Sequence, residues 1–292
     1  MKDTIIMTHT IKDTRKTVEA WKEAGYSIGI VPTMGYLHQG HASLIHRGAE
    51  ENDKVIVSIF VNPMQFSTNE DLDVYPRDMD RDRRICLDQG ADLIFRPDAK
   101  ELYPPGFCTF VDLTGPAEGL CGKSRQGMFR GVATVVLKLL LISGADKAYF
   151  GQKDAQQLAV VKKMAVDLNI PVQIVGCPII REDDGLAMSS RNAYLSIEER
   201  RAARCLSRSL RAGLELIHQG ERKSASIEGV IQEALSEEPL ARVDYIKIVD
   251  PYTIEPLHHI GSPALCAIAV YIGKTRLIDN FVWDPHAPDE SI

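Results

Sequence analysis

An apolar, strand-like run that ends in a turn with two glycines and two histidines constrains the chain most strongly. The run occupies residues 27–31, and P-T-M-G-Y-L-H-Q-G-H follows at 32–41, directly before a helical pattern. This order predicts a loop at the carboxyl end of a parallel strand, where open α/β sheets bind ligands. Glycines allow close backbone approach to an anion, and a helix N-terminus supplies unpaired N–H groups. His38 and His41 are three residues apart, so both can donate hydrogen bonds to phosphate oxygens from one side.

The first two-thirds of the chain alternates short apolar runs with helical patterns. This alternation is typical of βαβ units and predicts an α/β fold, a Rossmann-like parallel sheet with helices on both faces. Strands are expected at 27–31, 55–61, 92–95, 147–150 and 172–175, and helices at 41–52, 77–89, 131–143 and 154–168.

The pattern changes in the last part of the chain. Ser196 and Glu199 fit a capping box that opens a long amphipathic helix ending near Gly220. A further helix and three strands are expected at 227–236, 243–249, 264–271 and 277–282. We therefore expect a Rossmann-like domain at 1–184 and a smaller α+β domain, with an antiparallel sheet, at 185–292.

Composition and charge exclude several classes of protein. The 292 residues carry a formal net charge of −6, which argues against a broad surface for nucleic acid. No apolar run approaches the roughly 18 residues of a membrane-spanning helix, and residues 1–16 are too polar for a signal peptide. The six cysteines form no C-x-x-C pair and have no histidine at zinc-site spacing. We therefore expect a cytoplasmic protein with reduced thiols, no membrane and no nucleic-acid partner.

A second polar segment suits phosphate binding. Ser189 and Ser190 stand between Met188 and Arg191, and such a loop can close over a polyphosphate because arginine pairs strongly with phosphate oxygens. The same composition is common in ordinary loops. Here it follows the H-x-G-H sequence by about 150 residues, and in that position it resembles the second signature of the nucleotidylyl-transferases and class I aminoacyl-tRNA synthetases.

Five short motifs resemble one family more closely. They are P-T-M-G-x-L-H-x-G-H, V-N-P-x-Q-F, Y-P-R, G-x-K-D-x-Q-Q and S-S-R-N, which start at residues 32, 61, 75, 151 and 189. Together they resemble the pantothenate synthetase (pantoate–β-alanine ligase) family. The resemblance implies a reaction in two steps. ATP and (R)-pantoate give pantoyl adenylate and pyrophosphate, and β-alanine then attacks the mixed anhydride, which releases AMP and pantothenate.

The resemblance also implies partners and catalytic residues. ATP is expected as a substrate together with Mg²⁺, the partners are small molecules, and the protein is expected to be a cytoplasmic homodimer. The first domain would bind ATP and pantoate, and the smaller domain would cover the active site. His38, His41 and Lys153 are the implied catalytic residues, with His41 as proton donor. Lys153 belongs to G-Q-K-D, where the family usually has glutamate in place of Gln152.

The implied ligand contacts fall in the same motifs. Gln65 and Gln157 would hold pantoate, with Gln65 also near β-alanine, since amides both donate and accept hydrogen bonds. Asn62 and Met34 belong to the same expected site. Met34 and Ile180 would face pantoate's methyl groups and adenine, although core or loop packing explains them equally well. The residues expected to bind ATP are Met34, Gly35, Tyr36, Leu37, His38, Gln39, Gly40, His41, Gly151, Gln152, Lys153, Asp154, Ile180, Met188, Ser189, Ser190 and Arg191.

Some positions carry weaker signals. Asp154 could cap a helix or hold a ribose hydroxyl. Asp82 matches an acidic position of the family and is the expected magnesium ligand, although the mixed charges at 78–84 fit a solvated helix face as well. Segment 117–124 nearly matches a Walker A loop after a strand-like 109–113, but alanine replaces its first glycine. We therefore expect no P-loop there.

Three other functions fit parts of the pattern. Another H-x-G-H nucleotidyl transferase would lack the motifs at 61–66 and 151–157, which resemble the pantoate-specific part of the family. A regulator without catalysis is disfavoured because both histidines, Lys153 and the S-S-R segment are present. A tRNA-binding synthetase fragment is disfavoured by the acidic charge balance.

Overall fold

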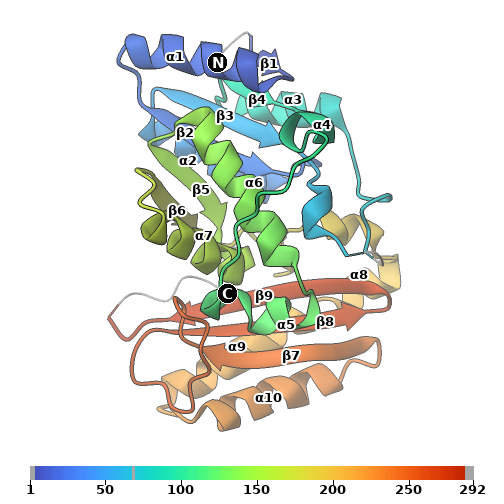
Figure 1. Cartoon of the computed structure of the whole chain (residues 1–292). Helices are drawn as coiled ribbons and strands as arrows, with labels where there is room; N and C mark the ends of the chain where they lie inside the picture. The colour runs from blue at the N-terminus through green and yellow to red at the C-terminus, as the bar shows by residue number, and fades with distance from the viewer. Residues whose placement is uncertain (1–3, 68–69, 287–292) are drawn as a thin grey trace.

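The computed structural model describes residues 4–67 and 70–286, and its larger sheet is fully parallel (Figure 1). The strands of this sheet are β1 (Ile6–Thr8), β2 (Ile28–Thr33), β3 (Lys54–Ile59), β4 (Leu93–Phe95), β5 (Lys147–Gly151) and β6 (Gln173–Cys177). They lie in the order β1-β4-β3-β2-β5-β6. The expected parallel sheet is confirmed.

The strand order reverses at β2, and this reversal creates a place for a ligand. From β2 the chain continues to β3 and β4 on one side, and it later adds β5 and β6 on the other side. The loops that leave β2 and β5 therefore diverge at the carboxyl ends of the strands, which is the switch point where open α/β sheets bind ligands. The H-x-G-H turn follows β2, and the G-Q-K-D segment includes the end of β5.

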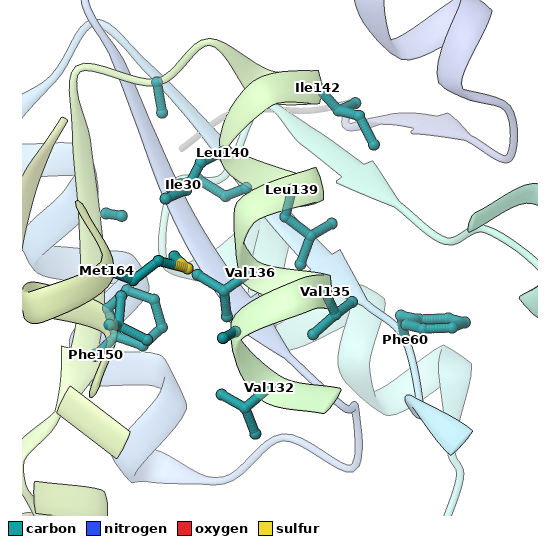
Figure 2. Close-up of a cluster of buried hydrophobic side chains, with 14 of the residues drawn as sticks. Ile30, Phe60, Val132, Val135, Val136, Leu139, Leu140, Ile142, Phe150 and Met164 are labelled. Atoms are coloured by element: carbon teal, nitrogen blue, oxygen red, sulfur yellow. The ribbon is translucent and has the colours of Figure 1, made fainter. Parts of the chain in front are cut away.

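Helices cover both faces of the parallel sheet, as expected. They are α1 (Ile11–Glu23), α2 (Gln39–Glu51), α3 (Met79–Asp88), α6 (Met128–Ser143) and α7 (Ala155–Asp167). One buried cluster joins α1, α6 and α7 to one face, and another joins α2 and α3 to the opposite face. Figure 2 shows Val136 and Leu140 of α6 beside Ile30 of β2 and Phe150 of β5. Since each buried side chain of this kind contributes about 1.5–3 kcal/mol, α6 strongly stabilises the sheet that carries the loops after β2 and β5.

Short helical segments complete the larger domain and lead into the smaller one. They are η1 (Pro63–Gln65), α4 (Ala99–Leu102), η2 (Gly115–Ala117), α5 (Leu120–Ser124), η3 (Gln152–Asp154) and η4 (Ser190–Tyr194). η1, η3 and η4 each overlap one of the sequence motifs, so the motif residues sit in tight turns next to regular elements.

The smaller domain has its own antiparallel sheet and hydrophobic core. The strands are β7 (Ala241–Val249), β8 (Ala264–Ile272) and β9 (Thr275–Trp283), and the helices are α8 (Ile197–Ala202), α9 (Cys205–His218) and α10 (Ser224–Ser236). In Figure 1 this sheet lies below the parallel sheet, with α10 on the side away from the larger domain. The expected α+β architecture is confirmed. The exact division between 184 and 185 stays a prediction.

The long helix expected after Ser196 is wrong in one respect, because it is broken into α8 and α9. The capping box of Ser196 and Glu199 is present at the start of α8. At Arg204 the helical hydrogen-bond pattern changes: its N–H donates to the carbonyl oxygen of Arg201, three residues earlier, at 3.4 Å. This turn separates the two helices.

Other differences concern short or half-exposed segments. The strand-like segment 109–113 is not a strand, because Val111 N–H donates to Thr134 Oγ1 of α6 at 3.0 Å instead of to a neighbouring strand. β1 and α1 were not expected, since β1 is very short and α1 is largely exposed. No helix within the described part of the chain is long and apolar enough to span a membrane.

Candidate active site

A cavity of about 1090 Å³ opens between the carboxyl edge of the parallel sheet and the smaller domain. Its walls come from the loops after β2, β3, β5 and β6, and from α6 and β9. The expected ligand residues that line it are Met34, His38, Gly40, His41, Asn62, Gln65, Gly151, Lys153, Asp154, Gln157, Ile180, Met188, Ser189, Ser190 and Arg191. Motifs from distant parts of the sequence therefore meet in one cleft.

Some expected ATP contacts lie outside the cavity wall. They are Gly35, Tyr36, Leu37, Gln39 and Gln152. The Leu37 side chain is fully buried in the core beneath α2, while Gln39 is exposed. Contact between these residues and ATP stays a prediction, and burial of Leu37 argues against contact through its side chain.

The turn after β2 is held by a buried carboxylate from α3. Asp82 is 2% exposed and accepts hydrogen bonds from the N–H groups of Tyr36 at 2.8 Å and Leu37 at 2.6 Å. Gly35 and Tyr36 have positive φ angles of 87° and 51°. A tyrosine in this region is strained, so the two hydrogen bonds stabilise a backbone conformation that its side chain disfavours.

The expected role of Asp82 as a magnesium ligand does not fit this geometry. Both carboxylate oxygens accept backbone hydrogen bonds, and the residue lies outside the cavity wall. Across residues 4–67 and 70–286, no group of three or more His, Cys, Asp or Glu side chains could hold a metal ion. Magnesium often binds through substrate phosphates and retained waters. Magnesium bound to the phosphates of ATP therefore stays a prediction.

The rings of His38 and His41 are in contact at the N-terminus of α2, with centroids 4.1 Å apart and planes tilted by 43°. Gly40 N–H donates to His38 Nδ1 at 3.1 Å, and His38 N–H donates to His41 Nδ1 at 3.3 Å. An accepting Nδ1 carries no proton, so each neutral ring carries its proton on Nε2. Both residues line the cavity, and their Nε2–H groups are the donors available for a ligand there.

Burial and nearby charges keep both rings neutral. Burial lowers the pKa of His38 to about 2, and repulsion from His41 once that ring is protonated, and from Lys153 and Arg81, adds to this change. Burial also lowers the pKa of His41 to about 4; Asp154 opposes this change and Lys153 adds to it. At neutral pH both histidines therefore donate hydrogen bonds as neutral imidazoles. The implied role of His41 as a proton donor stays a prediction, and this geometry favours hydrogen-bond donation.

Lys153 provides a cation on the wall of the same cavity. It lies in η3, and its Nζ is 4.0 Å from Asp154 Oδ1. A fixed cation there can neutralise charge on a phosphate group. Asp154 occupies the N-cap position of α7, as expected, but its side chain makes no capping hydrogen bond there. A contact with ribose stays a prediction.

The S-S-R loop reaches back to the H-x-G-H turn. Ser190 Oγ donates to the carbonyl oxygen of Tyr36 at 3.2 Å, which joins η4 to that turn. Arg191 forms two hydrogen bonds with Asp71, from Nε at 2.9 Å and from Nη2 at 2.8 Å. Burial would raise the pKa of Asp71, but the hydrogen bonds and charge of Arg191 outweigh it and hold that pKa below its usual value. A phosphate that binds Arg191 must share it with this carboxylate or replace it.

The expected pantoate pocket is organised around a buried amide. Asn62 is 1% exposed, and its Nδ2 donates to Gln65 Oε1 and to the carbonyl oxygen of Gly131, both at 3.1 Å. Its Oδ1 accepts from Tyr103 Oη at 2.8 Å. Gln65 Nε2 lies 3.2 Å from Met34 Sδ. Because the groups of Asn62 are already bonded, it holds Gln65 in place, and ligand contact by Asn62 itself is disfavoured.

Sequence reasoning missed residues that shape the cleft. A Cβ at Gly131 would lie 2.2 Å from a backbone carbonyl oxygen of η1, so glycine is required for α6 to pack there. Gln156 is buried beside Gln157, and its amide binds the N–H of Cys121 at 2.9 Å and the carbonyl oxygen of Gly119 at 2.7 Å. The pair Gln156-Gln157 could have indicated a packing role, but the sequence alone does not show which of the two glutamines is buried. The Walker-like segment follows no strand, and α5 already begins at Leu120 within it, so the strand, open loop and helix of a P-loop are not present there.

A switch-point cleft with two neutral histidines, a lysine and an arginine defines a Rossmann-like enzyme that handles the phosphates of a nucleotide. The family model described as pantoate-beta-alanine ligase matches residues 6–282. The chain belongs to the pantoate–β-alanine ligase family. The resemblance found in the sequence motifs is confirmed.

Curated relatives and solved structures support the same family. A pantothenate synthetase of Clostridium acetobutylicum is 54% identical over 94% of this chain and 98% of its own length, and one of Enterococcus faecalis is 53% identical over 96% and 99%. The structure of a pantothenate synthetase from Thermus thermophilus is 44% identical, with a TM-score of 0.89 over 94% of this chain and 98% of that one. A pantoate-beta-alanine ligase from Francisella tularensis, complexed with beta-gamma ATP and beta-alanine, is 35% identical, with a TM-score of 0.78 over 96% and 98%.

Proposed function

We propose that this protein condenses (R)-pantoate with β-alanine to pantothenate, with ATP as the energy source and pantoyl adenylate as the intermediate. The observation that carries the proposal is one cavity that collects the two histidines, Lys153 and Arg191 beside Gln65. Cations and N–H donors suit the triphosphate, and an amide suits the hydroxyl and carboxylate groups of pantoate. Membership of the family supports the same reaction.

In the first step, a carboxylate oxygen of pantoate attacks the α-phosphorus of ATP. A P–O bond forms to pantoate, the bond between the α-phosphorus and its bridging oxygen breaks, and pyrophosphate leaves with the electron pair. Lys153 and the Nε2–H groups of His38 and His41 stabilise the charge that grows on the leaving group. Gln65 and Gln157 hold pantoate so that attack is in line.

In the second step, the neutral amine of β-alanine attacks the carbonyl carbon of pantoyl adenylate. An amide C–N bond forms, the bond from that carbon to the adenylate oxygen breaks, and AMP leaves with the oxygen that came from pantoate. The amine gives up its proton to the surrounding water. Gln65 lies next to Met34, and an amide there can orient the attacking β-alanine as well as pantoate.

Three further features belong to the proposal. The ATP substrate enters as MgATP, which matches the preference of Mg²⁺ for phosphate oxygens and water. We further propose that the enzyme is a homodimer, on the family resemblance. A cytoplasmic location is proposed because the cysteine pattern suits a reducing compartment.

The proposed function predicts that AMP forms only when pantoate is present. The protein is incubated with MgATP, pantoate and β-alanine, and AMP and pantothenate are followed by liquid chromatography. We expect equal amounts of both products, and no AMP above background when pantoate is omitted. AMP that forms equally without pantoate, or no AMP from the complete mixture, contradicts the proposal.

A further inference from the structure

Two adjacent residues of β9 bind both halves of the phosphate site from the smaller domain. Asn280 and Asp279 are 3% and 1% exposed, and both lie on the wall of the cavity. Neither belongs to the sequence motifs at the site. Their contacts are with the backbone beside Lys153 and with the segment that leads into the S-S-R loop.

Asn280 fixes the backbone that carries Lys153. Its Nδ2 donates to the carbonyl oxygen of Gln152 at 3.1 Å and to that of Lys153 at 2.9 Å. These carbonyls lie on either side of the Lys153 Cα atom, so a single amide restrains η3 at the point where the lysine side chain leaves the backbone. The Oδ1 atom of Asn280 is buried and has no hydrogen-bond partner among the described residues. Because leaving a buried acceptor unpaired is unfavourable, asparagine at this position is explained by its two donors.

Asp279 fixes the segment before the S-S-R loop. Its carboxylate accepts from Arg181 Nη1 at 2.7 Å and Nη2 at 3.0 Å, and the Asp279 side chain has no exposed surface. Arg181 Nη1 also donates to the carbonyl oxygen of Gly185 at 3.0 Å, inside the turn 181–187. That turn ends at Met188, whose N–H donates to the carbonyl oxygen of Ile180 at 2.9 Å. The carboxylate thus holds the base of the loop that carries Arg191.

We infer that Asn280 and Asp279 are positioning residues that set the distance between Lys153 and the S-S-R loop across the cleft. They come from one strand, so the spacing of the two phosphate-binding halves depends on a rigid element of the smaller domain. This inference rests on the proposed function, since Lys153 acts on phosphate there. Asn280 acts through Lys153 and need not touch the ligand.

The inference predicts that Asn280→Leu and Lys153→Ala are not independent. Asn280→Leu keeps a similar volume and removes both donors. Alone, we expect it to lower kcat/KM for MgATP by about tenfold or more, because displacement of a catalytic group by about 1 Å has an effect of up to about 10². In the Lys153→Ala background, we expect less than about a threefold further loss, because the residue that Asn280 positions is already gone. Losses that multiply fully in the double variant contradict the inference.

Controls separate positioning from general stability. Asn52→Leu removes a comparable amide at the end of α2, whose Nδ2 donates to the carbonyl oxygen of Gly48 at 2.8 Å and to Tyr149 Oη at 2.7 Å. Asn52 does not itself line the cavity, and neither of these hydrogen bonds is to η3. It should lower the melting temperature without changing KM for MgATP. Any small decrease in kcat/KM that it causes should multiply fully with the decrease from Lys153→Ala, because the two sites are independent. If Asn280→Leu does not fold, Asn280→Ser keeps one donor and should show the same dependence on Lys153.

The matching variants for the second half are Asp279→Asn and Arg191→Ala. We expect the same non-additive loss between them, and independent losses would contradict the role of Asp279. Wild-type protein in the same assay separates the two proposals. AMP formation by wild type with unchanged kcat/KM in Asn280→Leu rejects the positioning role alone, whereas no AMP from wild type rejects the proposed function.

Discussion

Replacing His41 by alanine is expected to lower kcat for AMP formation by about 10²–10³ while the fold is retained. The substitution removes the Nε2–H donor that stabilises charge on departing pyrophosphate, and loss of one preorganised donor has an effect of this size. It also removes the Nδ1 acceptor of His38 N–H and the ring that contacts His38, so His38 loses its fixed position. Steady-state rates and a thermal melt of the purified variant measure the two effects.

A histidine on the same helix provides the matched control. His46 lies in α2 with 61% of its side chain exposed, and it pairs with Glu50 at 3.4 Å on the surface. His46→Ala should leave kcat within about twofold of wild type, since exposed surface substitutions are usually neutral. If His41→Ala also turns over at a near wild-type rate, His41 has no part in the chemistry.

Asp82→Ala is expected to lower kcat by about tenfold or more and the free energy of unfolding by about 1–3 kcal/mol. The N–H groups of Tyr36 and Leu37 would lose their buried acceptor, which has an energetic penalty of that order. The positive φ of Tyr36 would then be free to relax, and the histidines that follow would lose their positions. Chemical denaturation and steady-state rates measure the two quantities.

Added magnesium distinguishes the two roles of Asp82. If Asp82 holds the turn, raising Mg²⁺ well above the ATP concentration should not restore kcat in Asp82→Ala. Recovery of activity with magnesium would instead support the metal-ligand role expected from the family resemblance. Asp80→Ala, at an exposed position of the same helix, is the control and should behave as wild type.

The regular architecture could be predicted because the apolar periodicity is strong where elements are buried. The runs that became β2 and β3 alternate with amphipathic helices, and this pattern is sufficient for a parallel sheet. β1 was not predicted because a three-residue edge strand is too short to show a periodic apolar pattern. The break between α8 and α9 lies within a continuous amphipathic pattern, so tertiary packing decided it.

The site could be predicted where its residues form local motifs. The histidines, Lys153 and Arg191 sit in short sequences with recognisable spacing, and the cavity gathers them. Asp82 and Asn280 could not be assigned in this way, because their partners are 45 and 127 residues away. In the sequence, a carboxylate or amide in a helix or strand looks like any other polar residue, because only the fold shows which distant backbone groups it binds.

Transfer of an oxygen atom tests the central claim, an acyl-adenylate route, most directly. Pantoate labelled with ¹⁸O in both carboxylate oxygens is converted in one complete reaction with MgATP and β-alanine, and the products are analysed by mass spectrometry. Attack of the carboxylate on the α-phosphorus requires that AMP carry one ¹⁸O atom and that pantothenate keep one. Unlabelled AMP, or label in inorganic phosphate with ADP as the nucleotide product, would contradict the account.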